Sequence, residues 1–247
     1  MNITWALFKV EAIKLIKTPI IIIFGIAAPV FFMIMQSTMF KNNVDFVNQK
    51  VSMLDMSLPM CALMSIAVLG IGNVGVGLSH TRTVNYLKRL KATPAKKHNF
   101  ITANLMLQFI VMALTIAVLC AIAVFKFDVD LKNHNIPQFL LVLLISFMMC
   151  YFIGMFIGSV CEDPRSSQSV SMFVYFLCIF LGGFTMPIEL MPNILQKICY
   201  LIPTTHAVKI IQYAWNNVSI FTSYHFWVVT AITVVFGALT LKFFRYE

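Results

Sequence analysis

Apolar residues form long, nearly unbroken stretches along the chain. A helix needs about 20 apolar residues, at roughly 1.5 Å of rise each, to cross about 30 Å of hydrocarbon. Six stretches of the sequence meet or approach this length and carry few charged side chains. The pattern therefore predicts six membrane-spanning helices, over residues 20–39, 58–78, 101–125, 139–160, 169–186 and 224–241.

The residues before the first predicted span carry a helical pattern of their own. Three lysines lie on one side of this helix, and a separate stripe holds Trp5, Phe8, Ala12, Leu15 and Ile16. Separate apolar and basic faces are typical of helices that lie in the membrane interface. Residues 1–18 are therefore predicted to form an interfacial helix; the alternative is a ragged start to the first span.

Residues 187–223, between the fifth and sixth predicted spans, are too long and too apolar for a simple turn. Apolar side chains recur at helical spacing over residues 193–202, and the segment is divided by Pro187, Pro192 and Pro203. Prolines at these places suit helix stops and starts. The segment is predicted to be an outer re-entrant helical hairpin, shielded by protein from lipid; the alternative is a surface loop with one interfacial helix.

The composition agrees with the predicted spans. Hydrophobic residues make up 60% of the chain and charged residues 11%, against roughly 45–50% and about 25% in soluble domains. We therefore expect an all-α, polytopic membrane protein whose residues 1–247 form a single transmembrane domain. The six cysteines include no CxxC pair, so neither a disulfide framework nor a metal framework is expected.

The distribution of charge predicts the topology. With the N-terminus inside, twelve of the eighteen Lys and Arg residues fall in inner segments, and five of the nine acids fall in outer ones. Positive charge accumulates on the cytosolic side of membrane proteins. Both termini are therefore predicted to be cytosolic in a multi-pass protein of the cell membrane. The net charge of +9 then reflects topology, and no nucleic-acid partner is expected.

Signatures of catalysis do not occur in the sequence. It contains no GxxxxGK[ST], HExxH or GxSxG pattern, and its five histidines are scattered. Each of those patterns places a nucleophile, a metal ligand or a phosphate cradle at a required spacing. No catalytic, cofactor-binding or metal-binding residue is therefore expected in this chain.

Small and polar residues inside the spans suggest helix packing. Residues 70–75 spell GIGNVG, but this GxGxxG lies within an apolar span rather than after a strand, so a nucleotide site is not expected there. Small residues let membrane helices approach closely, and polar ones can bond across them or line a pathway. The candidates for these two roles are Gly70, Asn73, Gly77, Asn104, Gln108, Gly154 and Gly158.

The predicted spans contain no ionised residue. Transporters driven by a proton or sodium gradient usually carry carboxylates inside the membrane. A transporter without them draws its energy from a partner, or the protein is a passive channel. The sequence alone leaves both possibilities open.

The inner segment 79–99 carries six positive charges and no acid. Its charge alone is typical of a topology signal that attracts anionic lipid. Its residues 86–94, YLKRLKATP, resemble the basic LKRLRATP segment of the ABC-2 type permeases, in particular the drug-resistance exporters related to the daunorubicin resistance protein. A second resemblance lies in residues 182–192, GGFTMPIELMP, and 201–207, LIPTTHA.

The resemblance implies roles for three groups of residues. A coupling helix that seats on a separate ATPase would contain Arg82, Leu87, Lys88, Arg89, Leu90, Lys91 and Pro94. A second inner contact would contain Glu162, Asp163 and Arg165, and an outer gate would contain Pro187, Glu189, Pro192, Pro203 and His206. One departure is that Ser79–Arg82 stands where the family usually has an acid, so no salt bridge is carried over there.

The predicted function follows from these expectations. The chain is expected to be the permease subunit of an ATP-driven exporter of a hydrophobic or amphipathic cargo such as a drug, a peptide or a lipid-like molecule. It would pair with a second copy or a paralogue and with cytosolic ABC ATPases, which would bind ATP and Mg. The alternatives are a permease for lipid-linked polysaccharide, and a channel-forming or structural membrane protein that is independent of nucleotide.

Overall fold

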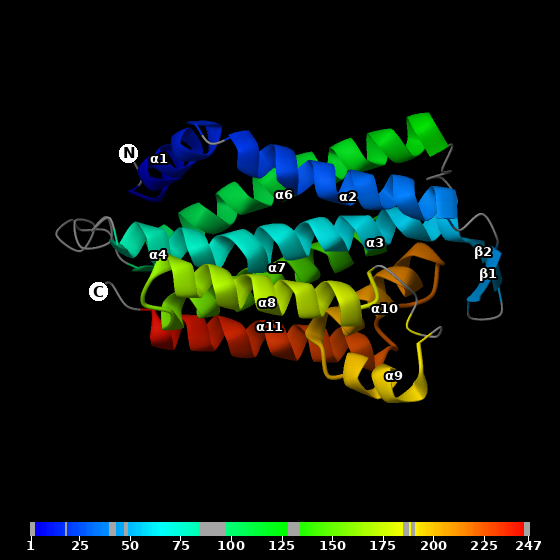
Figure 1. Ribbon diagram of the computed structural model, residues 1–247. Helices are drawn as coiled ribbons and strands as arrows, with labels where there is room; N and C mark the ends of the chain where they lie inside the picture. The colour runs from blue at the N-terminus through cyan, green and yellow to red at the C-terminus, as the bar shows by residue number, and fades with distance from the viewer. Residues whose placement is uncertain are drawn as a thin grey trace.

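The computed structural model describes residues 3–17, 19–39, 43–46, 49–83, 97–127, 134–184, 188 and 191–244. Long helices lie side by side in one bundle, with a short hairpin at one end (Figure 1). The elements are α1 (Ile3–Lys17), α2 (Pro19–Met39), β1 (Asn43–Phe46), β2 (Gln49–Ser52), α3 (Met53–Ala67), the π-helix η1 (Val68–Val74), α4 (Gly75–Thr83), α6 (Lys97–Phe127), α7 (Ile136–Val160), α8 (Pro164–Leu181), α9 (Asn193–Cys199), α10 (Pro203–Trp215) and α11 (Tyr224–Phe243).

Each of the six apolar stretches forms a helix. Four helical stretches are long and apolar enough to cross a membrane: Ser57–Thr83, which joins α3, η1 and α4, then His98–Lys126, Ile136–Val160 and Tyr224–Phe243. The first and fifth predicted spans correspond to α2, a helix of 21 residues with Pro29 inside it, and to α8, a helix of 18 residues. The number of six membrane crossings stays a prediction.

One element departs from the predicted all-helical architecture in the part of the chain that is described. β1 pairs antiparallel with β2, so that Val44 lies opposite Val51 and Asp45 opposite Lys50. Each strand has only four residues. The apolar pattern does not identify strands this short, because period-2 alternation needs a longer run to stand out.

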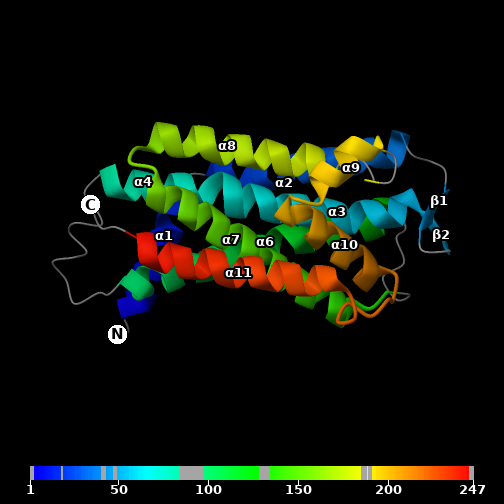
Figure 2. The same ribbon diagram turned by 90° about the horizontal axis from the view of Figure 1, so that it is seen from below.

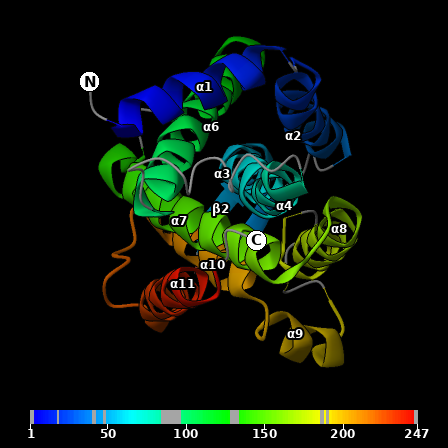
Figure 3. The ribbon, with the colours of Figure 1, turned by 90° about the vertical axis from the view of Figure 1, so that its left-hand side faces the viewer.

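The first helix is separate from the first predicted span. Figure 3 shows α1 crossing the direction of the bundle, whereas α2 runs along it. α1 packs mainly on α6, and Leu7 is buried in the main core. Exposed apolar side chains remain on this helix at Trp5, Ile13 and Ile16. The geometry favours a distinct helix over a ragged start to α2, and its place at a membrane interface stays a prediction.

Helix α7 is the centre of the fold. It packs against α11, η1, α10, α4 and α3, and Figure 3 shows it between these elements. The largest side chains of the core include Tyr151 and Phe147 of α7, Phe100 of α6 and Trp215 of α10, all fully or almost fully buried. The bundle is therefore organised around one helix that reaches from end to end.

Local signals in the sequence explain where α7 and α8 begin. The Asn135 side chain accepts a hydrogen bond from the Gln138 N–H, and Asp163 caps α8 by accepting from the Ser166 N–H at 3.2 Å. A proline follows each capping residue in the first turn, where its fixed φ suits a helix and its missing N–H costs nothing.

Candidate functional site

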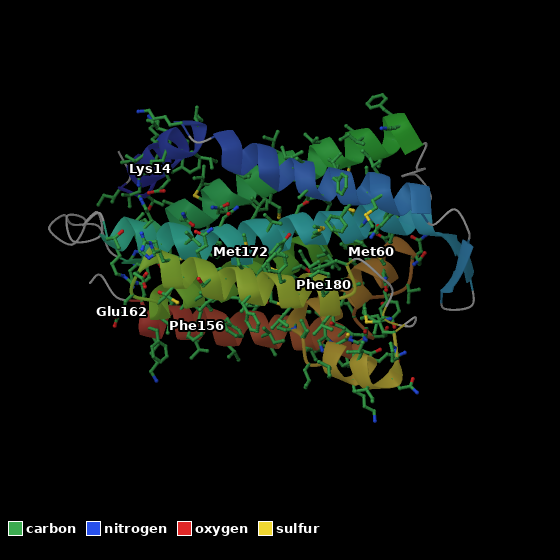
Figure 4. All side chains as sticks on the ribbon, viewed as in Figure 1. Lys14, Met60, Phe156, Glu162, Met172 and Phe180 are labelled. Atoms are coloured by element: carbon green, nitrogen blue, oxygen red, sulfur yellow. The ribbon has the colours of Figure 1, made fainter. Side chains whose placement is uncertain are left out.

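The two ends of the bundle carry different polar clusters. We call the end that holds Arg82, Cys161 and Glu162 the arginine end, and the end that holds Tyr200, His206 and His225 the histidine end. Figure 1 shows both ends of the chain at the arginine end, and α9 with the β1–β2 hairpin at the opposite end. Glu162 and Lys14 are labelled at the arginine end in Figure 4.

At the arginine end, Arg82 lies in the last turn of α4 and points into the protein. Its side chain is 9% exposed. One terminal guanidinium nitrogen donates to the carbonyl of Cys161 at 2.9 Å, and the other donates to the carbonyl of Gly158 at 3.1 Å. These carbonyls belong to the C-terminal turn of α7, where acceptors lack helical partners and the helix dipole is negative. Arg82 therefore joins α4 to α7.

The other residues of the predicted coupling helix lie outside the described part of the chain. They are Leu87, Lys88, Arg89, Leu90, Lys91 and Pro94. α4 ends at Thr83, so this segment follows Arg82 directly. Arg82 is buried and bonded to the end of α7, and the predicted contact of this segment with an ATPase stays a prediction.

The predicted second inner contact lies at the turn between α7 and α8. Glu162, Asp163 and Arg165 are all exposed there. The Ser166 hydroxyl and its backbone N–H donate to the Asp163 carboxylate, and these hydrogen bonds hold the pKa of Asp163 below its ordinary value. Asp163 stays charged and caps α8. Glu162 and Arg165 are left on the surface beside it.

Close contacts between glycines of facing helices allow η1 and α4 to pack directly against the backbone of α7. A Cβ added at Gly154 would lie 2.0 Å from the Gly70 oxygen, and one added at Gly158 would lie 2.5 Å from the Gly75 oxygen. Both distances are far shorter than real contacts, so only glycine fits. Gly77 is not part of this contact, because a Cβ added there meets nothing within 4 Å; Gly75 takes the place that the sequence suggested for Gly77.

The polar residues proposed inside the spans differ in their surroundings. The Tyr151 hydroxyl lies 3.0 Å from the Ile101 carbonyl and 3.3 Å from the Asn104 side-chain oxygen. Asn73 and Gln108 are half-buried. Asn104 is therefore linked by a hydrogen bond to Tyr151 of α7. Asn73 and Gln108 are only partly shielded from the surroundings of the protein.

At the histidine end, α9 and α10 follow α8. Pro192 is the N-cap of α9, and Pro203 occupies the first turn of α10. Helix α10 lies between α3 and α11, against α7 (Figure 2), and nearly all its side chains are buried. The predicted pair of short helices is therefore present; its re-entrant position in a membrane stays a prediction. Pro187 and Glu189 lie outside the described residues.

A histidine pair joins α10 to α11. The Nδ1 atoms of His206 and His225 are 2.7 Å apart, and His206 Nε2 lies 3.0 Å from the Tyr200 carbonyl. A carbonyl oxygen can only accept, so His206 Nε2 carries a hydrogen and donates. In the neutral ring Nδ1 then accepts from the His225 Nδ1–H. Partial burial lowers the pKa of His206 below its ordinary 6.5, which favours this neutral state.

Aromatic rings surround the histidine pair. The rings of Tyr224 and His225 are 3.9 Å apart between centroids, and the Tyr200 ring is nearly parallel to that of His225. Among these residues, only His206 was predicted from the sequence to belong to a site. The others could not be found from spacing, since α9, α10 and the start of α11 meet only in the folded chain.

Polar side chains also hold the end of α8 near the histidine end. The buried Gln36 of α2 donates from Nε2 to the Phe184 carbonyl at 2.9 Å. Thr205 of α10 donates to the Leu181 carbonyl at 3.3 Å. These neutral donors satisfy carbonyls at and just beyond the C-terminus of α8, so three elements meet there.

The outward faces of the bundle are strongly apolar. Helix α8 exposes a run of aromatic rings at Phe173, Phe176 and Phe180, and Phe180 is labelled on the outside of this helix in Figure 4. Exposed apolar surface on this scale is typical of a protein that contacts lipid or another subunit. In the described part of the chain, no three His, Cys, Asp or Glu residues gather as a metal site would require.

These features define a polytopic helical membrane protein with polar clusters at its two ends. The chain matches the ABC-2 type transporter family over residues 3–215. It is also 20% identical, over 231 residues that cover 91% of this chain and 93% of the relative, to a Bacillus subtilis (strain 168) protein named "Putative transport permease YvfS". The chain therefore belongs to the ABC-2 type transporter family, whose members are the membrane subunits of transporters. The resemblance seen in the sequence is confirmed.

Proposed function

We propose that this chain is the permease subunit of an ATP-driven exporter that moves hydrophobic or amphipathic molecules across the cell membrane. The observation that carries the proposal is the match to the ABC-2 type transporter family over residues 3–215. Membership in this family implies association with ABC ATPase subunits. In this proposal ATP and Mg bind to those subunits, and this chain supplies the membrane path.

The arrangement of the arginine end supports an ATPase contact there. The segment after α4 and the turn between α7 and α8 are far apart in sequence, yet the hydrogen bonds of Arg82 bring their bases together. Both ends of the chain lie at the same end of the bundle (Figure 1). We assign this end to the cytosol, in accord with the positive charge of residues 79–99.

The apolar surface supports the class of cargo and a second permease subunit. The large apolar side chains that α6 and α8 expose are Phe, Leu, Met, Ile and Val, and none of the described interior polar residues of these two helices is charged. A path between two copies of this chain, or between this chain and a paralogue, would present such surfaces to cargo. In the proposed cycle, ATP binding closes the ATPases and shifts the pair from inward-facing to outward-facing.

Co-purification tests the proposal. The tagged chain, extracted from its own membranes, is expected to bring down an ABC ATPase, whose hydrolysis of ATP then depends on this chain. Leu87→Asp and Leu90→Asp place a carboxylate in the expected apolar contact, and each should weaken ATPase binding by about tenfold or more. Leu201→Asp is the matched control, because Leu201 is an exposed leucine at the histidine end.

The outcomes separate the proposal from its alternatives. Loss of the ATPase in the Leu87 and Leu90 variants, with normal insertion and normal behaviour of the Leu201 variant, supports the coupling contact. Failure of the wild-type chain to retain any ATPase contradicts the proposal and favours a channel-forming or structural protein. Unchanged binding in both leucine variants shows that residues 86–94 act as a topology signal only.

A further inference from the structure

The Arg82 side chain points into the protein, whereas the side chain of a residue that binds a partner subunit points outward. Arg82 is the second-last residue of α4, directly before the basic segment, yet only 9% of its surface is exposed. Two of its terminal N–H groups donate to the carbonyls of Cys161 and Gly158, on an element that lies more than seventy residues further along the chain. Its charge is therefore used inside this subunit.

The planar guanidinium suits these acceptors. It presents several N–H donors in a fixed fork and keeps its charge at any physiological pH. The carbonyls that it binds are at the C-terminal end of α7, whose dipole favours a cation. Hydrogen bonds from a charged donor are shorter and stronger than neutral ones. This is a firm link between α4 and α7 at the arginine end.

The link continues into α8 and back into α4. Two residues after Cys161, Asp163 caps the first turn of α8. Gly158, whose carbonyl accepts from Arg82, is also pressed against Gly75 at the start of α4. Helices α4 and α7 are thus joined by a glycine contact at one point and by Arg82 at another. Two separate points of attachment prevent one helix from pivoting on the other.

From this geometry we infer that Arg82 is a positioning residue that makes the end of α4 and the α7–α8 turn move as one body. The inference rests on the proposed function: a push from the ATPase on residues 84–96 would then reach α7 and α8 together. Arg82 makes no contact with the ATPase in this account. Without it, the ATPase still binds and hydrolyses ATP, but the motion of α4 is no longer passed in full to α7 and α8.

Distance measurement on the permease alone tests the rigid link. Spin labels are placed at Thr83 and Glu162, which are both exposed, as unnatural amino acids so that the six native cysteines remain. The wild-type chain in lipid nanodiscs should give one narrow distribution of distances. Arg82→Gln should broaden or split this distribution, because the shorter, neutral amide cannot donate charged hydrogen bonds to both carbonyls. Lys242→Gln, which removes an exposed cation from the last turn of α11, should leave it unchanged.

Function in the ATPase complex is the second readout. Arg82→Gln should retain the ATPase within about twofold and keep its hydrolysis, while ATP-driven transport falls by about tenfold or more. Arg82→Lys keeps the charge but offers a compact ammonium in place of the fork, so it should recover part of the transport and part of the narrow distribution. If Arg82→Gln does not insert, the Arg82→Lys distances and transport decide.

Three results would overturn the inference. One is normal transport in Arg82→Gln, and another is a narrow, unshifted distance distribution in both Arg82 variants. The third is loss of ATPase binding with an unchanged distance, which would make Arg82 a direct contact of the ATPase. These results differ from a failure of the proposed function, in which the wild-type chain itself shows no ATPase, while its distance measurement remains valid.

Discussion

At the arginine end of the bundle a permanent cation binds main-chain carbonyls, whereas at the histidine end neutral side chains bind one another. Arg82 donates to the carbonyls of Gly158 and Cys161. His206 and His225 share a hydrogen bond between their Nδ1 atoms, among tyrosine rings. The first junction keeps its charge at any physiological pH, whereas the second depends on a neutral imidazole at His206, which burial favours and acid opposes.

This difference suggests that the two ends of the bundle have different mechanical roles. A junction held by a fixed charge and by close glycine contacts suits a part that transmits force without deforming. A junction held by single neutral hydrogen bonds and ring contacts suits a part that opens and closes, because each bond contributes only about 1 kcal/mol. We therefore expect the arginine end to resist perturbation of pH and the histidine end to respond to it.

Gly154→Ala is expected to have the largest effect, since it disrupts the contact between α7 and η1, two elements that lie between the two ends of the bundle. The added Cβ would lie 2.0 Å from the Gly70 oxygen, so α7 and η1 must separate along the contact. Overpacking of this kind costs about 1–3 kcal/mol and occasionally more. Thermal unfolding in detergent measures it. Gly77→Ala is the matched control and should be neutral, because its Cβ meets nothing within 4 Å.

The second prediction concerns the effect of pH on stability, which should be larger at the histidine end than at the arginine end. The folded state favours neutral His206, whose pKa is lowered by burial, while the unfolded ring titrates near 6.5. Its contribution to stability is therefore complete above pH 6.5 and is lost as the pH falls below that value. The melting temperature should drop by roughly a few degrees between pH 7.5 and 5.5.

His206→Phe is the control for this pH effect. It should lower the melting temperature at pH 7.5, because the bonds to His225 and Tyr200 are lost, yet it should reduce the further drop at pH 5.5. Arg82→Lys should leave the size of the drop unchanged. A full drop in the His206 variant would show that other groups cause the pH dependence.

The third prediction concerns the neutral donors at the histidine end. Gln36→Leu removes the bond to the Phe184 carbonyl and leaves that buried acceptor without this partner. The expected loss of unfolding free energy is about 1–3 kcal/mol. Gln108→Leu, at a half-buried position of α6, should cost less. Equal effects of the two substitutions would contradict a role for Gln36 in holding the end of α8.

The smallest effect is expected at the cap of α8. Asp163→Ala removes the acceptor for the Ser166 N–H and should lower stability slightly, whereas Asp163→Asn can still accept and should lower it less. Because hydrogen bonds from Ser166 lower the pKa of Asp163, this contribution is present above the unfolded pKa and is lost as acid protonates the folded carboxyl. Hydrogen exchange in the first turn of α8 measures it.

The helices of this fold could be predicted from sequence, because a spanning helix needs a long apolar run and little else. Every such run forms a helix over most of its length in the structure, although α8 ends at Leu181, before the predicted end of the fifth span at residue 186. The prolines at 192 and 203 do begin short helices. The π-helix could not be predicted, since no apolar pattern distinguishes it from an α-helix.

That π-helix explains why the glycine contact differs from the expected one. Residues 70 and 77 share a face of an α-helix, which has 3.6 residues per turn. A π-helix bonds residue i to i+5, so it places Gly75, five residues after Gly70, on the face that meets α7. The polar clusters were missed for another reason: Arg82 and His225 find their partners on elements distant in sequence, and residue spacing carries no information on such pairs.

The most direct test of the account is transport in sealed inside-out vesicles that contain this chain and the ATPase with which it co-purifies. A lipophilic fluorescent dye serves as the probe of an apolar cargo. We expect uptake that requires ATP, this chain and an active ATPase together. Dye movement that is equally fast without ATP, or with an ATPase that cannot hydrolyse it, would contradict the assignment of this chain as an ATP-driven permease subunit.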